Sequence, residues 1–220
     1  MSRVLPILFN MKMVRAILDC RKSCTRRIIK PQPQGYFEVS EEPLYIYDTD
    51  GKQGKITPPY QPGDILYVRE TFIQAAAHIF WYKADDKPWM SKDLLWKPSI
   101  HMPKEAARIW LKVTDVRVER LQEITEAQAQ AEGIRGYSKD GNLYKYAVTD
   151  DWWIDFHNKH RKSFFGGTWW QDMPRTAKDA FSYLWNSTIK KSDLTCYGWN
   201  ANPWVWVIEF ERCEKPKGEN

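Results

Sequence analysis

The sequence predicts an α+β fold, a small mixed β-barrel of five to six strands with flanking short helices and insertions. Short β-branched or aromatic runs alternate with turn residues, and only two or three segments have helical spacing. Aromatic residues make up 15% of the chain and 12 of them are tryptophans, which predicts an aromatic core or rings that stack on bases. We therefore expect one elaborated domain over residues 1–213 and a charged tail at 214–220.

Several segments have the composition of strands because they are short, rich in β-branched or aromatic residues, and bounded by turn residues. They are residues 4–9, 25–30, 44–47, 55–57, 65–72, 79–83, 107–118 and 204–211. Asp50-Gly51 lies between residues 44–47 and residues 55–57 and predicts that these two segments form a hairpin. Residues 79–83 are expected to pair with 65–72.

Three segments are expected to be helical, at residues 11–20, 126–132 and 177–185. Asn10 can cap the first, whose apolar face is Val14, Ile17 and Leu18. Thr125 and Gln128 form a capping box for the second, and Gly133 ends it. The remaining segments, near 36–60, 74–104 and 135–175, are interpreted as insertions.

No stretch approaches the run of about 20 apolar residues that a membrane-spanning helix needs. Residues 4–9 are too short and too interrupted by proline for the apolar core of a signal peptide. We therefore expect a cytoplasmic protein without a membrane partner. The four cysteines form no Cys-x-x-Cys pair, and His157 and His160 have no matching third ligand, so neither a metal nor another cofactor is expected.

Positive charge gathers near the start of the chain. From Met1 to Gly35 there are eight lysines and arginines against one acid, Asp19, although the whole chain has a net charge of only +5. This asymmetry favours a polyanionic or phosphate-bearing partner, namely RNA or a modified nucleoside and possibly DNA; the alternative is a solvated basic surface. The sequence does not indicate an oligomeric state.

Lys22 and Thr25 stand among the arginines directly after the first predicted helix. A hydroxyl becomes a nucleophile once a base removes its proton, and a lysine whose charged form is disfavoured by nearby cations can be that base. Glu132, at the end of the second predicted helix, is the candidate third partner. The alternative is that Lys22 and Thr25 only bind a phosphate.

Other side chains are candidates for binding substrate. Arginines can hold an anion, a charged pair inside the 65–72 strand can face the mouth of the barrel or form a structural ion pair, and indoles with amides can stack on and read a base. They are Arg21, Arg26, Arg27, Arg69, Glu70, Trp199, Asn200 and Trp204. For the last three, a strand-entry turn packed by tryptophan is the alternative.

The run Leu18-Asp19-Cys20-Arg21-Lys22-Ser23-Cys24-Thr25-Arg26 resembles the signature hydrophobic-x-Gly-x-Lys-Thr-x-Thr-x-Arg of ASCH domains, which have a PUA-like fold. Gly63-Asp64-Ile65-Leu66-Tyr67-Val68 is similar to their Gly-Asp strand, and the 126–132 helix and closing strand follow in family order. The resemblance covers about half of the chain and is closest to the larger, tryptophan-rich members of bacteriophages and prophages. Cys20 stands where the family has glycine, so its turn is either not left-handed or strained.

The ASCH family includes a small bacterial amidohydrolase that removes the acetyl group from N(4)-acetylcytidine. Its lysine, threonine and glutamate fall on Lys22, Thr25 and Glu132. The resemblance thus implies an amidohydrolase in which Lys22 deprotonates Thr25, Thr25 attacks the amide carbonyl, and Glu132 carries the proton to the leaving amine. The alternatives are a non-catalytic RNA- or DNA-binding module and a nuclease that use the same basic segment.

Overall fold

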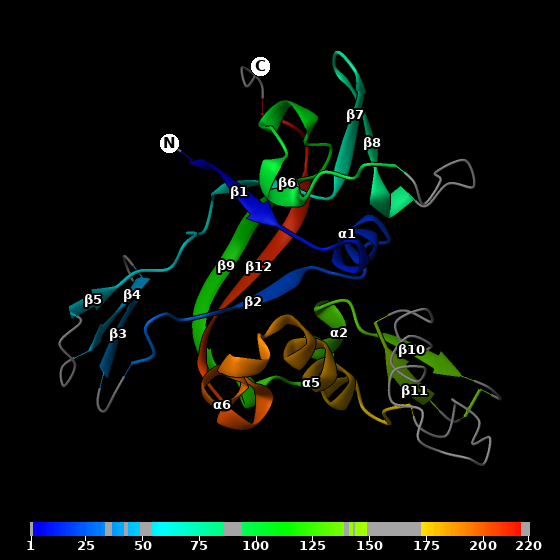
Figure 1. Cartoon of the computed structure of the whole chain (residues 1–220). Helices are drawn as coiled ribbons and strands as arrows, with labels where there is room; N and C mark the ends of the chain where they lie inside the picture. The colour runs from blue at the N-terminus through cyan, green and yellow to red at the C-terminus, as the bar shows by residue number, and fades with distance from the viewer. Residues whose placement is uncertain are drawn as a thin grey trace.

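The computed structural model describes residues 2–33, 37–41, 44–48, 54–85, 94–138, 141–142, 144–148 and 173–216. Within these residues the chain is a mixed α+β protein made mostly of strands, with few short helices (Figure 1). The largest sheet has the strand order β1-β6-β9-β12-β2, in which β1 and β6 are parallel and the other neighbours are antiparallel. Its strands are β1 (Val4–Leu8), β6 (Ile65–Arg69), β9 (Trp110–Arg120), β12 (Trp204–Cys213) and β2 (Cys24–Ile28).

The first strand and helix form as the sequence predicts. Asn10 caps α1 (Met11–Leu18) by accepting a hydrogen bond from the Met13 amide, and Val14 and Ile17 are buried. The chain then returns as β2, which pairs with β12 and forms one edge of the sheet. Thus α1 connects the two edge strands, β1 and β2.

The strand predicted over residues 65–72 is divided into two, so this prediction was too long. β6 ends at Arg69, and the chain resumes as β7 (Phe72–Ala76). The pairing partner changes at this break, since β6 pairs with β1 as far as Arg69, whereas Phe72 pairs with Tyr82. β8 (Ile79–Tyr82) therefore pairs with β7, outside the large sheet, and not with β6 as expected.

The closing strand β12 is buried on both faces. Trp206, Ile208 and Phe210 belong to one apolar cluster, with Ile7, Val14 and Leu111 among its other members. Val205 and Val207 belong to a second cluster on the opposite face. This explains why residues 204–210 are almost continuously apolar instead of alternating with polar residues.

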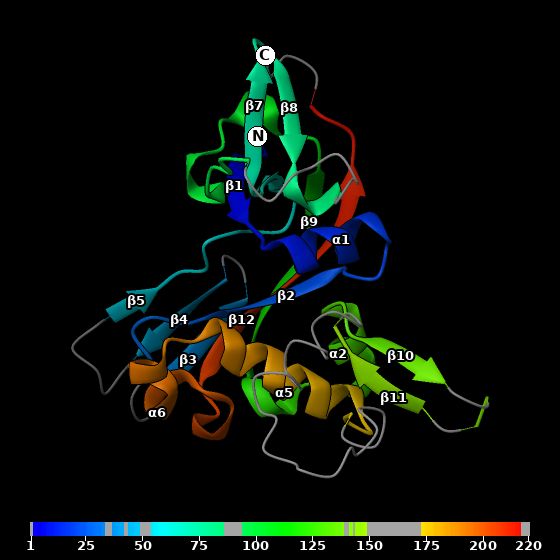
Figure 2. The same ribbon diagram turned by 45° about the vertical axis from the view of Figure 1, so that its right-hand side comes forward.

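Short helices cover the second cluster. The capping box of α2 (Glu126–Ala131) is present, with Thr125 at the N-cap. α5 (Ala177–Thr188) buries Phe181, Leu184 and Trp185 against it, and α6 (Leu194–Tyr197) follows. α1 and α5 lie on opposite sides of β2, so the free edge of β2 runs between them (Figures 1 and 2).

Two smaller sheets fall inside the segments interpreted as insertions. β3 (Phe37–Glu41), β4 (Leu44–Asp48) and β5 (Gly54–Ile56) form one, which includes the predicted hairpin. β10 (Arg135–Ser138) and β11 (Tyr144–Ala147) form the other. Residues 149–172, which include His157 and His160, lie outside the described residues. No helix in the described part of the chain is long and apolar enough to cross a membrane.

Candidate functional site

The site begins where the ends of α1 and α2 meet. Cys20 has a left-handed backbone with φ of 57°, which lets the amides of Arg21 and Lys22 both donate to the Ala16 carbonyl, at 2.8 and 3.0 Å. Gly133 ends α2 with φ of 103°, and a Cβ there would lie 3.0 Å from the Ala16 Cβ. The turn at Cys20 is therefore left-handed, and the close packing of the two helix ends aligns Lys22 with Glu132.

Lys22 and Glu132 form a buried ion pair. The Lys22 Nζ donates to Glu132 Oε2 at 2.6 Å, to the Glu132 carbonyl at 3.1 Å and to the Cys24 carbonyl at 2.7 Å. The two side chains are 0% and 3% exposed. Three acceptors therefore surround Nζ, and no position around it is left for a neighbouring hydroxyl. This arrangement does not provide the base that Lys22 is expected to be.

Arg26 connects this pair to a chain of alternating charges. Its NH1 lies 3.3 Å from Glu132 Oε1, and its NH2 lies 3.0 Å from Glu119 Oε2. Glu119 in turn pairs with Arg117 at 2.6 Å, and Arg117 also binds Asp115 and Glu209. The carboxylate of Glu132 is therefore fixed between two cations, Lys22 and Arg26.

Thr25 is buried at 3% exposure and lines a cavity of about 70 Å³ at the free edge of β2. Glu132, Arg26 and Arg27 also line it. The remaining lining residues are Met13 from α1 and Phe181, Leu184, Trp185 and Thr188 from α5. None of the hydrogen bonds among the described residues involves the Thr25 hydroxyl.

Arg27 closes the gap between the two edge strands. Its NH2 donates to the carbonyl of Leu8, the last residue of β1, at 3.0 Å, and its guanidinium lies 5.4 Å from the centre of the Phe9 ring. The Lys22 ammonium lies over the same ring at 5.6 Å. Burial lowers the pKa of Arg27 from its ordinary value, since it penalises the charged form.

Cys24 lies next to the Lys22–Glu132 ion pair and has an unreactive thiol. Burial, with the Glu132 charge nearby, raises the pKa of its thiol to about 12. The thiolate is the reactive form of cysteine, so Cys24 is not a candidate nucleophile near neutral pH. Arg21, one of the predicted binding residues, does not line the cavity: it donates to the Gly133 carbonyl at 2.7 Å and pairs with Asp19 at 2.9 Å, so it secures the contact between the helix ends.

Arg69 and Glu70 lie apart from this cavity. Glu70 is 1% exposed and accepts two hydrogen bonds from Arg108, at 2.9 and 3.0 Å. Of the two expected alternatives, a side chain at the mouth of the barrel or a structural ion pair, Glu70 forms the ion pair, with Arg108 as its partner. Arg69 donates to the Ile100 carbonyl. The structure gives neither residue a contact with Thr25 or Glu132 within the described residues, so neither belongs to the candidate site.

The Trp199, Asn200 and Trp204 group does not form one surface. Trp199 packs edge-on against Phe181 on the second apolar cluster, with ring centres 6.2 Å apart, while Asn200 is exposed. Trp204 packs against Phe37, on the first cluster, with ring centres 4.7 Å apart. The two indoles are divided between different faces, and none of the three residues lines the Thr25 cavity.

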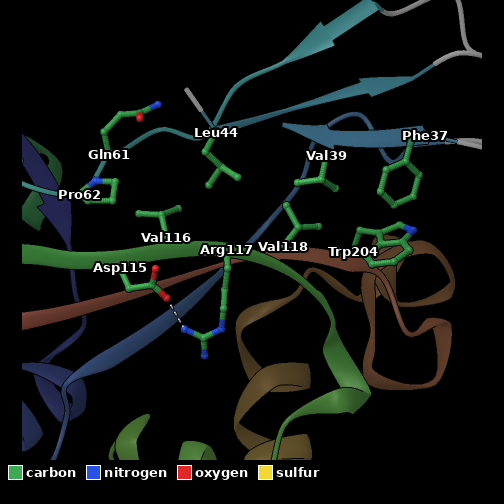
Figure 3. A pocket seen from close by; sticks show the side chains of 10 residues that line it. All are labelled: Phe37, Val39, Leu44, Gln61, Pro62, Asp115, Val116, Arg117, Val118 and Trp204. Carbon is green, nitrogen blue, oxygen red and sulfur yellow. Dashed lines mark hydrogen bonds and ion pairs between the residues drawn. The ribbon is translucent and has the colours of Figure 1, made fainter. Parts of the chain in front are cut away.

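Trp204 instead lines a larger groove of about 780 Å³ between β9 and the β3–β4 pair. Val116 and Val118 point from β9 toward β3 and β4, whereas Asp115 and Arg117 point to the other side of β9 (Figure 3). The groove and the Thr25 cavity have no lining residue in common. The groove is therefore a separate, mainly apolar feature.

Sequence reasoning missed two parts of the site. Glu119 is not among the predicted site residues, although charged residues alternate with valines along residues 115–119 and indicate a charged strand face. The α5 wall was also missed, because Phe181, Leu184 and Trp185 have the spacing of ordinary core residues. Nothing in their sequence indicates which strand they face.

Within the described residues, no group of three His, Cys, Asp or Glu side chains is arranged to hold a metal ion. Comparison of the chain with protein-family models, with curated proteins and with solved structures found no match.

Proposed function

We propose that the protein is an amidohydrolase that deacylates a nucleoside of the N(4)-acetylcytidine type, with Thr25 and Glu132 as catalytic residues. One observation carries the proposal: a hydroxyl without an internal hydrogen bond among the described residues and a buried, ion-paired carboxylate line the same small cavity. A buried hydroxyl that shares a cavity with a carboxylate held by two cations supports acyl transfer over simple contact with a phosphate backbone. The signature residues of the ASCH resemblance fall on the same positions.

The proposed roles differ from the sequence expectation. Lys22 donates all three of its hydrogens, two of them to Glu132, so in this proposal it positions Glu132, and the carboxylate of Glu132 accepts the Thr25 proton. Thr25 Oγ1 bonds to the acyl carbon, the C–N bond breaks, and the proton passes to the leaving amine. Water then cleaves the ester, which releases a carboxylate and restores the hydroxyl. Arg26 and Arg27 stabilise the oxyanion.

The same proposal includes the fold. In this proposal the five-stranded sheet is a PUA-like barrel of the ASCH kind. The helices α1 and α5 lie on either side of β2, one of its edge strands. The barrel is open between β1 and β2, where the Arg27 side chain reaches the Leu8 carbonyl. The cavity lies at this opening, so a substrate can approach it from the edge of β2.

The decisive experiment is conversion of N(4)-acetylcytidine to cytidine by the wild type and three variants. Thr25→Ala is expected to lower kcat/KM by about 1,000-fold, whereas Thr25→Ser keeps a hydroxyl and retains turnover. Thr188→Ala is the matched control, because Thr188 also lines the cavity but donates its hydroxyl to the Trp185 carbonyl. No turnover by folded wild-type protein contradicts the proposal for this substrate.

The second candidate is a non-catalytic RNA- or DNA-binding module. It is supported by cations that stack on aromatic rings away from the cavity, with Lys30 4.7 Å from the Tyr197 ring centre and Arg120 4.2 Å from that of Trp204. Affinity for RNA that falls steeply with salt, without turnover of the nucleoside, would favour this function. A nuclease would instead cleave the bound strand.

A further inference from the structure

The two carboxylate oxygens of Glu132 are held unequally. Oε2 accepts a hydrogen bond from the Lys22 ammonium at 2.6 Å, which is a short contact for a charged pair. Oε1 lies 3.3 Å from the Arg26 NH1, whereas charge-assisted N–H···O bonds are usually about 2.7–2.9 Å long. Arg26 makes only this one contact with Glu132, although arginine and carboxylate commonly form two parallel bonds. Oε1 is therefore the less engaged oxygen.

Glu119 holds the other end of the same guanidinium. Its Oε2 accepts from the Arg26 NH2 at 3.0 Å, a shorter contact than the one between Arg26 and Glu132. Its Oε1 accepts from the Arg117 Nε at 2.6 Å and from the Gln128 Nε2 at 3.4 Å. The carboxylate of Glu119 is thus fixed by side chains from β9 and α2, and Arg26 bridges it to Glu132.

Arg26 has no contact with solvent that could replace either carboxylate. Its side chain is 0% exposed, and its Nε–H is buried without an acceptor among the described residues. Within the described residues, Glu119 and Glu132 are its only ion-pair partners. Because water screens buried charges little, the position of the guanidinium depends on the balance between these two attractions. Loss of the charge at Glu119 would therefore move it toward Glu132.

We propose that Glu119 is a positioning residue, which holds the Arg26 guanidinium back from Glu132 and so keeps a lone pair of Glu132 Oε1 for an incoming proton. The inference rests on the proposed function in one respect, namely that this proton comes from Thr25, which lines the same cavity as Glu132. Without Glu119, Arg26 would bind Glu132 through two bonds and occupy that lone pair. Glu119 does not itself line the cavity, so it acts through Arg26.

The position of Arg26 can be measured without turnover. Crystal structures of the wild type and of Glu119→Met are expected to differ at Arg26: in the variant, NH1 and NH2 should both lie within about 3 Å of the Glu132 oxygens. Glu119→Gln removes the charge but keeps an acceptor, so it should show a smaller movement in the same direction, and it replaces Glu119→Met if that variant does not fold.

Glu209→Met is the matched control. Glu209 also pairs with Arg117, at 2.6 Å, but it makes no ion pair or hydrogen bond with Arg26. Its substitution should keep the single contact of 3.3 Å between Arg26 and Glu132. An Arg26 guanidinium that stays in place in both Glu119 variants, or that moves equally in Glu209→Met, would overturn the inference.

Kinetics show whether the position of Arg26 matters for the reaction. Glu119→Met should lower kcat for N(4)-acetylcytidine about tenfold and leave KM within about twofold, because proton transfer is impaired while the cavity lining is unchanged. In an Arg26→Met background the same substitution should lower kcat less than about twofold, since Glu119 acts through Arg26. Losses that multiply in the double variant would indicate a structural role and contradict the inference, as would a rise in KM at unchanged kcat.

The two proposals can fail separately. Movement of Arg26 in Glu119→Met, with no turnover of N(4)-acetylcytidine by the wild type, would support the positioning of Arg26 by Glu119 and contradict the amidohydrolase. Turnover by the wild type that Glu119→Met retains in full would support the amidohydrolase and contradict the role of Glu119.

Discussion

Glu132 and Glu70 are both buried carboxylates paired with cations, yet their surroundings differ. Glu70, at 1% exposure, shares Arg108 with Asp85, so two carboxylates meet one guanidinium, which also lies 3.9 Å from the centre of the Tyr82 ring. Burial raises the pKa of Glu70, although Arg108 opposes the shift. Glu70, Arg108 and Asp85 line neither the Thr25 cavity nor the groove beside Trp204.

Glu132, at 4% exposure, has the opposite balance. Cations outnumber carboxylates around it, a hydroxyl is available, and a cavity reaches the group. Burial and ion pairing are therefore common to a structural pair and to a candidate catalytic pair. The charge excess and the cavity distinguish them.

The largest expected difference is in turnover. Glu132→Gln should lower kcat/KM for N(4)-acetylcytidine at least about 100-fold, because an amide cannot accept the Thr25 proton. Glu70→Gln should change it less than about twofold, since Glu70 serves only the Arg108 pair. Steady-state kinetics of the two variants, with circular dichroism to confirm folding, provide the comparison. Equal losses of kcat/KM in the two variants would mean that Glu132, like Glu70, contributes to stability and not to catalysis.

A smaller difference is expected in how strongly each pair is coupled. A double-mutant cycle of Lys22→Met and Glu132→Gln should give a coupling of about 2 kcal/mol in the free energy of unfolding, because both side chains are desolvated. The cycle of Arg108→Met and Glu70→Gln should give about 1 kcal/mol, since Arg108 keeps Asp85 and is 26% exposed. Urea unfolding measures both cycles. A stronger coupling at Arg108 would contradict the ranking.

The sequence predicted the order of elements well and the site in part. Strong local signals, such as Asn10 at the start of α1 and Thr125 at the start of α2, formed as expected. Lys22, Thr25 and Glu132 were grouped by their residue types and by a family signature, because 110 positions separate the lysine from the glutamate and no local pattern encodes that contact. What joins them is the packing of Ala16 against Gly133.

The errors have a common cause. Glu70 and Trp204 are chemically suitable for a binding site, and composition alone does not tell which face of the sheet they occupy. The 65–72 strand is divided because its pairing partner changes from β1 to β8, and local β-propensity does not encode which segment pairs with it. The same limit applies to Glu119, whose partner Arg26 lies 93 positions away.

The pH dependence of stability isolates Glu70. Because burial raises the pKa of Glu70 above its usual 4.5, the native state keeps the proton to higher pH than the unfolded chain. The free energy of unfolding contributed by Glu70 therefore falls as pH rises from about 4.5 to the native pKa, by about 1.4 kcal/mol for each pH unit between those two values. Urea unfolding from pH 4 to 7 should show the wild type losing stability relative to Glu70→Gln. A relative gain would mean that Arg108 outweighs burial.

The smallest expected effect concerns only the Glu132 region. Cys20 bears the steric cost of a left-handed backbone, with φ of 57°, at the turn that presents Lys22. Cys20→Gly should raise the free energy of unfolding by about 0.5–1 kcal/mol, while Cys20→Ala keeps the Cβ and should give no gain. Hydrogen exchange locates the change: the Lys22 amide, bound to the Ala16 carbonyl, should exchange more slowly, and the Phe72 amide near Glu70 should not. A gain spread equally over both amides would show that the helix end stabilises the whole fold and does not specifically hold the Lys22–Glu132 pair.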